Sequence, residues 1–264
     1  MIYRFLILIF FVVLSCKKEE STSILIIGHG GMGIEFSGSV YVDNSKEAIQ
    51  LCFDMEGTDG VEIDVHLSKD GDLWAYHPDD LSENTNSSGC IENLLLQDLE
   101  DLKYKGLRKE RLVRLKDMNL QHADKRILLD LRHFNSCKGS TIDVNDMILA
   151  LNDLPEYLKN PSRVRVITRN PYWISHIINA GFKVIYANDI ESEVNEAQQI
   201  NPQLNGVIMK NSDISKAQVT NFKAQGLTVF IYEVRSPKAL KEIRDKDPDG
   251  VLSDDVQGAI IELK

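Results

Sequence analysis

From residue 24 to the C-terminus, the sequence alternates short apolar segments with longer segments of helical periodicity. This alternation is typical of repeated βα units around a parallel sheet. Strands are predicted at residues 24–28, 61–66, 127–131, 164–168, 183–186, 206–208, 228–232 and 250–252. Helices are predicted at residues 45–55, 95–104, 115–122, 144–158, 172–180, 194–200, 214–224, 237–243 and 256–263.

Eight βα units without an obvious linker favour an α/β fold of the closed TIM-type (β/α)8 barrel over an open doubly wound sheet. A dinucleotide-binding fold would need a Gly-x-Gly-x-x-Gly turn after the first strand, and the glycines of residues 28–33 have a different spacing. Residues 72–92 are rich in Asn, Ser and Gly, so they are predicted to be an insertion over one mouth of the barrel. Residues 24–264 are therefore expected to form one barrel domain.

The second and third predicted strands carry acidic residues. Because side chains alternate along a strand, Glu62, Asp64 and His66 share one face. The third strand is apolar until Asp130 and Arg132, at the C-terminal end where active sites of such barrels lie. Glu62, Asp64 and Asp130 form an oxygen-rich set suited to one hard divalent cation, Mg²⁺ or Ca²⁺. The alternatives are a solvent-exposed strand face and a structural ion pair of Asp130 with Arg132 or a neighbouring residue.

Two histidines occupy positions that suit acid–base chemistry. His29 directly follows the first strand among glycines, and His77 follows the second strand and its turn. Histidine titrates near neutral pH, so the pair can act as general base and general acid in one displacement. Each histidine taken singly has the alternative of a structural or surface role.

The same residues resemble motifs of the glycerophosphodiester phosphodiesterase family. In chain order the family motifs are His-Arg-Gly, Glu-Asn-Thr, Glu-x-Asp, Thr-x-Asp-Gly, His-Asp, Glu-Ile-Lys, Trp-Thr-Val-Asn and Asp-Gly-Ile-x-Thr-Asp. The similar segments here are residues 29–31, 43–45, 62–64, 68–71, 77–78, 130–132, 232–235 and 249–254. The resemblance spans the predicted barrel, and residues 59–77 are its most specific part.

The resemblance implies a phospholipase-C-like phosphodiesterase barrel with defined roles for these residues. The three carboxylates would hold the metal, and both histidines would move protons to and from the reacting oxygens. Arg132 would neutralise the phosphodiester, and Tyr232 would contact a glycerol-like moiety.

Four departures from the family pattern bear on activity. The arginine beside the first histidine is Gly30 here, so one phosphate-binding cation is missing from its usual place. Arg132 replaces a lysine, and its planar guanidinium can grip two phosphate oxygens. Asp130 is one methylene shorter than the usual glutamate, and Pro78 replaces the acid that normally follows the second histidine.

The N-terminus has the pattern of a bacterial lipoprotein signal. Arg4 gives a positive n-region, residues 5–13 are an apolar run too short for a membrane span, and Leu-Ser before Cys16 resembles a lipobox. Residues 1–16 would then be a signal peptide ending at lipidated Cys16, and residues 17–23 a polar tether. The protein would be lipid-anchored at a bacterial cell envelope, periplasmic or on the outer surface. The alternative is an ordinary secretory signal or a single anchor.

Charge and cysteine content limit the partners. A formal net charge of -10 argues against nucleic acid as a partner. The other cysteines, Cys52, Cys90 and Cys137, have no CxxC spacing, so neither a zinc site nor a disulfide framework is predicted. One pair can still form in an oxidising periplasm, although the pairing cannot be read from the spacing, and buried free thiols are an equal alternative. The sequence carries no signal for the oligomeric state.

The predicted function is a metal-dependent hydrolase that cleaves a glycerophosphodiester, or a related small phosphodiester, to an alcohol and a phosphomonoester. Two alternatives stay open. One is a lipoprotein that only binds a phosphorylated ligand on the same barrel, which Gly30 keeps open. The other is a lyase-like relative that forms a cyclic phosphate.

Overall fold

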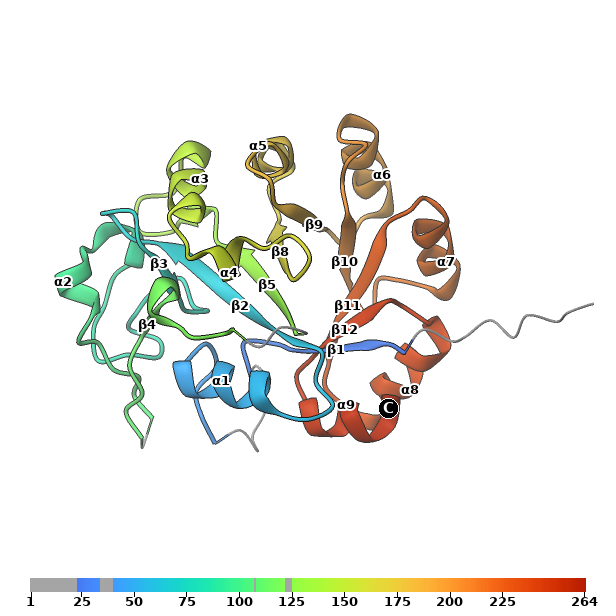
Figure 1. The fold of residues 1–264 in the computed structure, drawn as a ribbon, viewed down its shortest axis with the longest axis horizontal. Coiled ribbons are helices and arrows are strands. Elements are labelled where there is room, and N and C mark those ends of the chain that lie inside the picture. The colour runs from blue at the N-terminus through green and yellow to red at the C-terminus, as the bar shows by residue number, and fades with distance from the viewer. Residues whose placement is uncertain (1–22, 34–39, 107, 122–124) are drawn as a thin grey trace, which may run out of the picture.

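A closed barrel of eight parallel strands forms the centre of the molecule (Figure 1). The computed structural model describes residues 23–33, 40–106, 108–121 and 125–264. In spatial order the strands are β1 (Leu25–Gly28), β2 (Gly60–Leu67), β5 (Arg126–Leu131), β8 (Val164–Thr168), β9 (Lys183–Ala187), β10 (Gly206–Lys210), β11 (Thr228–Val234) and β12 (Gly250–Ser253). Because β1 pairs with both β2 and β12, the sheet closes on itself. The predicted TIM-type barrel is confirmed, and each predicted strand end is within two residues of the observed one.

Helices cover the outside of the barrel, as Figure 1 shows. They are α1 (Lys46–Asp54), α3 (Val144–Asn152), α4 (Glu156–Lys159), α5 (Ile174–Asn179), α6 (Glu191–Ile200), α7 (Lys216–Ala224), α8 (Pro237–Lys246) and α9 (Val256–Leu263). Their starts follow local capping chemistry. Ser45 caps α1 through the amide of Ala48, and Ser215 forms a capping box with Gln218 at α7. No helix in the described part of the chain is both long and apolar enough to cross a membrane.

The prediction of helices at residues 95–104 and 115–122 is wrong. Among the described residues from 91 to 121, the only α-helix is the short α2 (Leu96–Leu99), and two 3-10 turns lie at Ile91–Asn93 and Leu115–Asp117. Strands β3 (Leu73–Ala75) and β4 (Val113–Arg114) extend the sheet antiparallel from β2. The apolar side chains of this insertion pack into a separate small core: Trp74, Tyr76, Leu81, Ile91, Leu99, Tyr104 and Leu112. Tertiary packing of turns therefore overrides the local helical pattern.

The single helix predicted at residues 144–158 is two helices. Helix α3 ends at Asn152, and α4 begins at Glu156, directly after Pro155. Proline disfavours the helical conformation of the preceding residue and cannot donate an amide hydrogen bond, so the helix is interrupted there.

Alternating side chains divide the core into two layers. Val61, Ile63 and Val65 of β2 belong to the large cluster between the barrel and its helices. Lumen-facing residues of the other strands form a smaller cluster: Ile27, Leu128, Ile167, Ile185, Ala187, Ile208, Phe230, Tyr232 and Leu252. This arrangement directs Glu62 and Asp64 of β2 into the barrel, as the period-two pattern predicted, whereas His66 contacts Glu92 of the insertion.

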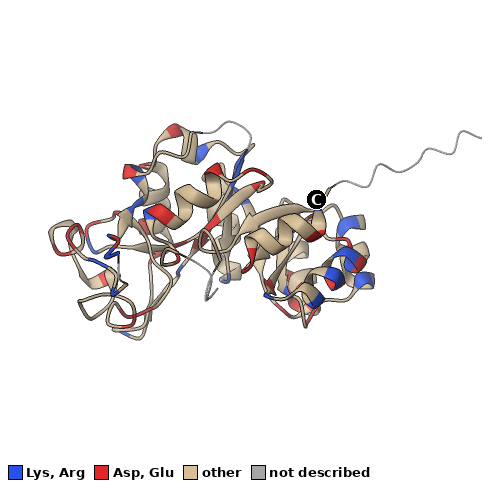
Figure 2. Cartoon of the chain, turned by 90° about the horizontal axis from the view of Figure 1, so that it is seen from below, with Lys and Arg blue, Asp and Glu red and all other residues tan. Residues whose placement is uncertain are grey.

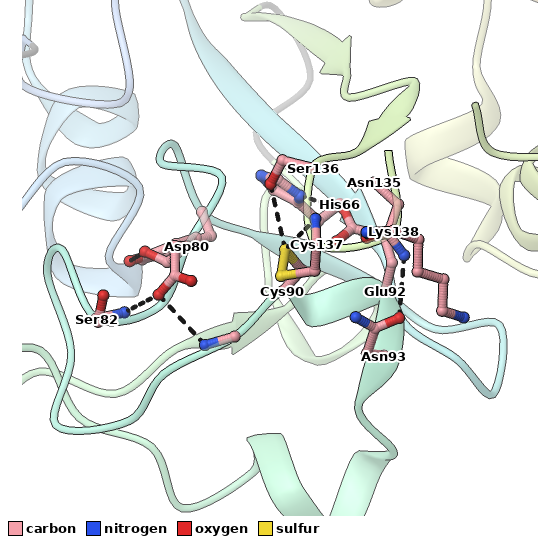
Figure 3. The surroundings of a disulfide bond; sticks show 12 residues. His66, Asp80, Ser82, Cys90, Glu92, Asn93, Asn135, Ser136, Cys137 and Lys138 are labelled. Carbon is pink, nitrogen blue, oxygen red and sulfur yellow. Dashed lines mark hydrogen bonds and ion pairs between the residues drawn. A yellow bond between two sulfur atoms is a disulfide. The ribbon is translucent and has the colours of Figure 1, made fainter. Parts of the chain in front are cut away.

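A disulfide between Cys90 and Cys137 joins the β2–β5 insertion to the turn of the short β6–β7 hairpin (Phe134–Asn135 and Ser140–Thr141; Figure 3). Cys52 is a buried free thiol. Cys16 lies outside the described residues, so its lipidation stays a prediction. In Figure 2 the basic and acidic positions are interspersed over helices and loops.

Candidate active site

Three carboxylates lie together where β2 and β5 run side by side. Glu62 and Asp64 are on β2, and Asp64 pairs with Asp130 of β5 in the sheet register. All three are more than nine-tenths buried. One oxygen from each lies within 4.8 Å of the others. The structure therefore excludes a solvent-exposed strand face and brings together the three predicted metal ligands.

The electrostatics of this cluster favour a cation. Burial raises the pKa of Glu62 well above its usual range, and the nearby Asp64 and Asp130 add to the effect. Burial also raises the pKa of Asp130. Glu62 Oε2 accepts the amide of Gly30 at 2.8 Å, but the buried Oε1 has no hydrogen-bond partner among the described residues. An unpartnered oxygen beside two further carboxylates is a donor set that fits a hard divalent ion.

Asp64 is held by neutral and positive partners. Its Oδ2 accepts from the Asn44 side chain at 2.8 Å, and its backbone amide donates to Asn44 Oδ1 at 2.9 Å. Arg132 forms an ion pair with Asp64 Oδ1. Burial opposes ionisation of Asp64, but Arg132, His77 and His29 outweigh it and lower the pKa. The arginine thus pairs with the carboxylate on the neighbouring strand rather than making the Asp130 pair considered from the sequence.

His29 lies at the barrel mouth directly after β1. Its Nδ1–H donates to Asp254 Oδ1 at 2.6 Å, and Asp254 Oδ2 accepts from Arg235 Nε at 2.9 Å. Burial disfavours the charged imidazole, but the Asp254 hydrogen bond and the charges of Glu62, Asp254 and Asp64 raise the pKa of His29 to about 9. With Nδ1 bound to a carboxylate, Nε2 is the nitrogen left for chemistry in the pocket.

His77 enters the site from the insertion. The amide of its neighbour Tyr76 donates to the Asp64 carbonyl at 3.1 Å, which fixes this segment beside β2. Burial raises the pKa of Asp43, and the nearby His77 opposes that rise. Asp43 thus supplies a carboxylate near His77 where Pro78 has removed the adjacent acid. His66, by contrast, turns to the insertion and pairs with Glu92 at 2.6 Å.

One cavity of about 160 Å³ collects most of these side chains at the C-terminal mouth of the barrel. Its lining residues are His29, Asp64, His77, Asp130, Arg132, Ile167, Arg169, Ala187, Ile208, Tyr232, Glu233, Arg235 and Leu252. Six of the seven predicted catalytic, metal and substrate residues line it, and Glu62 lies in the adjoining carboxylate cluster. Their grouping follows from barrel geometry, because the C-terminal ends of parallel strands converge on one face.

Tyr232 forms one wall of the cavity. Its hydroxyl donates to Asp189 at 3.1 Å, and the guanidinium of Arg169 lies 5.7 Å from the centre of its ring. Burial raises the pKa of Tyr232 to about 12, so the phenol stays protonated at neutral pH. Between Ile231 and Val234 the pairing of β11 with β12 shifts register, and Glu233 has a positive φ of 59°. This irregularity places Glu233 on the cavity lining.

The sequence prediction missed Arg169, Arg235 and Asp254. Each follows a predicted strand within three residues, and a charged residue just past a barrel strand is the signal that identifies them. Arg169 and Arg235 supply cations to the cavity although Gly30 stands in place of the family arginine.

The model of the glycerophosphoryl diester phosphodiesterase family matches residues 29–257. The protein YhdW of Bacillus subtilis strain 168, provisionally named a glycerophosphodiester phosphodiesterase, is 21% identical over 223 residues, which cover 80% of this chain and 88% of YhdW. A phosphodiesterase of Oleispira antarctica, solved with the product sn-glycerol-3-phosphate, is 22% identical with a TM-score of 0.75, covering 91% of this chain and 96% of that one. A glycerophosphodiester phosphodiesterase of Parabacteroides distasonis is 21% identical with a TM-score of 0.70, covering 91% and 98%. At these identities the solved structures establish a shared fold.

Proposed function

The chain belongs to the glycerophosphoryl diester phosphodiesterase family of phosphoric diester hydrolases, and from this premise we propose that it hydrolyses glycerophosphodiesters, or a related small phosphodiester, with one divalent cation. The observation that carries the proposal is the grouping of three carboxylates and two histidines around one cavity at the barrel mouth. Arginines beside these acids give the same cavity a place for a phosphodiester anion.

Glu62, Asp64 and Asp130 would hold the cation, Mg²⁺ or Ca²⁺. When bound, the cation supplies charge stabilisation to the phosphoryl oxygens. The unpartnered Glu62 Oε1 and the raised pKa values of Glu62 and Asp130 support this assignment. Arg132 would bind a phosphoryl oxygen and keep Asp64 ionised, and Tyr232 would contact the glycerol moiety.

The two histidines would move the protons. His77 accepts a proton from the attacking water as the new P–O bond forms. His29 donates its Nε2 proton to the departing alkoxide oxygen as the old P–O bond breaks, which yields an alcohol and a phosphomonoester. Asp254 suits His29 to the acid role, because its hydrogen bond favours the protonated imidazole.

The test is hydrolysis of several glycerophosphodiesters by the purified chain, with Mg²⁺, Ca²⁺ or a chelator, followed by phosphorus NMR. We expect a phosphomonoester that appears only with a cation. Asp130→Asn should lose activity and metal response, whereas Asp146→Asn, an exposed carboxylate beside a different cavity, should retain both. A cyclic phosphate would instead support the lyase-like alternative. No turnover with any cation, from folded protein, would support the ligand-binding alternative.

We further propose that the protein is a lipoprotein of a bacterial envelope, anchored through Cys16. The support is the sequence pattern alone. In bacterial cells we expect wild type in the detergent phase of a Triton X-114 extract and Cys16→Ser in the aqueous phase. Equal partitioning of the two chains would contradict the anchor.

A further inference from the structure

A second cavity of about 110 Å³ adjoins the first one at the barrel mouth. The two cavities share three lining residues, Asp130, Arg132 and Arg169. One of these is a proposed cation ligand, and the other two are arginines. Anionic oxygens are drawn to such a junction, so a phosphodiester placed there directs its two alcohol substituents into different cavities.

The residues that line only the second cavity include no arginine, unlike the three residues that the two cavities share. They are Asp79, Leu131, His133 and Phe134. Phe134 is 43% exposed, an unusual position for a phenylalanine beside a reactive site. The Asp79 carboxylate is exposed and makes no hydrogen bond or ion pair with any residue that the structure describes. This cavity therefore offers a free carboxylate and an open aromatic ring.

A disulfide links the two chain segments that carry Asp79 and Phe134, and Figure 3 shows the surroundings of this bond. Asp80, next to Asp79, accepts from the amide of Gly89 at 3.2 Å, and the next residue, Cys90, is bonded to Cys137 in the β6–β7 turn. Phe134 belongs to the same short hairpin.

A second contact reinforces the link. Asn135 donates to the Asn93 side chain at 3.0 Å, so the insertion and the hairpin are also joined by a hydrogen bond. The disulfide and this hydrogen bond therefore hold together the two segments that carry Asp79 and Phe134.

We propose that this second cavity binds the departing alcohol of the substrate and that Asp79 and Phe134 select an alcohol bearing an ammonium group. The proposal rests on the proposed phosphodiesterase function and adds the substrate class. A carboxylate together with an aromatic ring attracts an alkylammonium cation.

The charge order along the site also fits such a substrate. Arg132 and Arg169 at the junction match the phosphate anion, while Asp79 beyond them matches a cation a few bonds away. Arg132 forms an ion pair with Asp64, and Arg169 lies over the ring of Tyr232. Both partners line the first cavity, so both guanidinium groups are held in position from that side.

The experiment compares kcat/KM of the full chain, with its divalent cation, on glycerophosphocholine, glycerophosphoethanolamine and glycerophosphoglycerol. The wild type should prefer at least one ammonium substrate over the neutral glycerol ester by about fivefold, as expected for an exposed ion pair with a cation–π contact. Asp79→Asn and Phe134→Leu should each reduce that preference by about two- to fivefold. Asp146→Asn removes the same charge elsewhere and should leave the preference unchanged.

Each outcome either supports or overturns the proposed subsite. A preference for both ammonium esters indicates selection by charge, and a preference for glycerophosphocholine alone indicates selection of the quaternary group by the aromatic ring; either supports the subsite. Turnover of all three esters at equal rates, or a preference that Asp79→Asn leaves intact, would overturn the subsite while the phosphodiesterase function stands. Absence of any turnover would overturn both.

Discussion

Neutralising Glu62 should have opposite effects on stability with and without a divalent cation. Without the cation, Glu62 contributes a third carboxylate to a buried cluster and has an unpartnered oxygen. Glu62→Gln removes that charge and keeps the side-chain carbonyl that accepts the Gly30 amide. The variant should therefore be more stable than wild type in chelator, yet lose the stabilisation that the cation gives.

The geometry sets the size of both effects. Two unit charges 4.8 Å apart interact by about 3.5 kcal/mol at an effective dielectric constant of about 20. Partial protonation relieves much of this repulsion, because the pKa of Glu62 is raised, so we expect a net gain of about 1–2 kcal/mol, or about 3–6 °C in Tm. For wild type, a cation at about 100 times its Kd should add about 2.7 kcal/mol, or about 5–10 °C.

The gain should also depend on pH. Since the folded-state pKa of Glu62 lies above its ordinary value of 4.5, its charged form destabilises the fold at pH values above the folded-state pKa. The penalty decreases as pH falls through that pKa, because the carboxyl then binds a proton in the folded state. Glu62→Gln should thus exceed wild type in Tm most at alkaline pH, in chelator.

The assay is thermal unfolding of wild type, Glu62→Gln and Asp146→Asn in chelator and in titrated Mg²⁺ or Ca²⁺. The control should respond to the cation as wild type does. A Glu62→Gln variant that is less stable than wild type in chelator, or that keeps the full cation-dependent rise in Tm, would refute the account of the carboxylate cluster.

Further predictions concern His29, its partner Asp254 and the cysteines. His29→Ala should lower kcat by about two to four orders of magnitude, measured with cation at saturation, because it removes the proposed general acid; retention of kcat would exclude that role. Asp254→Asn should lower kcat/KM by about 10- to 100-fold and shift the His29 limb of the pH–rate profile to lower pH, because the pKa near 9 depends on the Asp254 hydrogen bond; an unmoved limb would contradict it. Replacing Cys90 and Cys137 together by serine should lower the free energy of unfolding by about 2–4 kcal/mol, measured by urea denaturation. Burial raises the pKa of the Cys52 thiol to about 12, so Cys52 should stay unreactive to Ellman's reagent until the chain unfolds.

Local patterns determined the barrel and the acidic part of the site. Each strand is a short apolar run whose position follows from its own residues, and eight such runs with helices between them close in one common way. Period-two alternation placed Glu62 and Asp64 on one face of β2, and the end of the next strand placed Asp130 beside them. These relations depend on neighbours in sequence and on the regular register of parallel strands.

The structure of the insertion could not be predicted from local sequence patterns. The leucine-rich segment around α2 has helical spacing, but its apolar side chains pack on Trp74 and Tyr76, which come from earlier in the chain. The pairing of Cys90 with Cys137 across 47 residues likewise depends on where two loops meet. Contacts of this kind carry no periodic signal, so they cannot be read from the segment itself.

The sequence by itself thus determined the fold, the carboxylates and the two histidines. Only the tertiary structure decided that Asp254 holds His29. It also showed that Arg169 and Arg235 line the first cavity, although Gly30 stands in place of the family arginine. Finally, it placed Asp79 and Phe134 on one second cavity. The physical reason is that strand alternation is set by backbone geometry within a few residues, whereas a charge partner is set by which strand ends and loops converge at the barrel mouth.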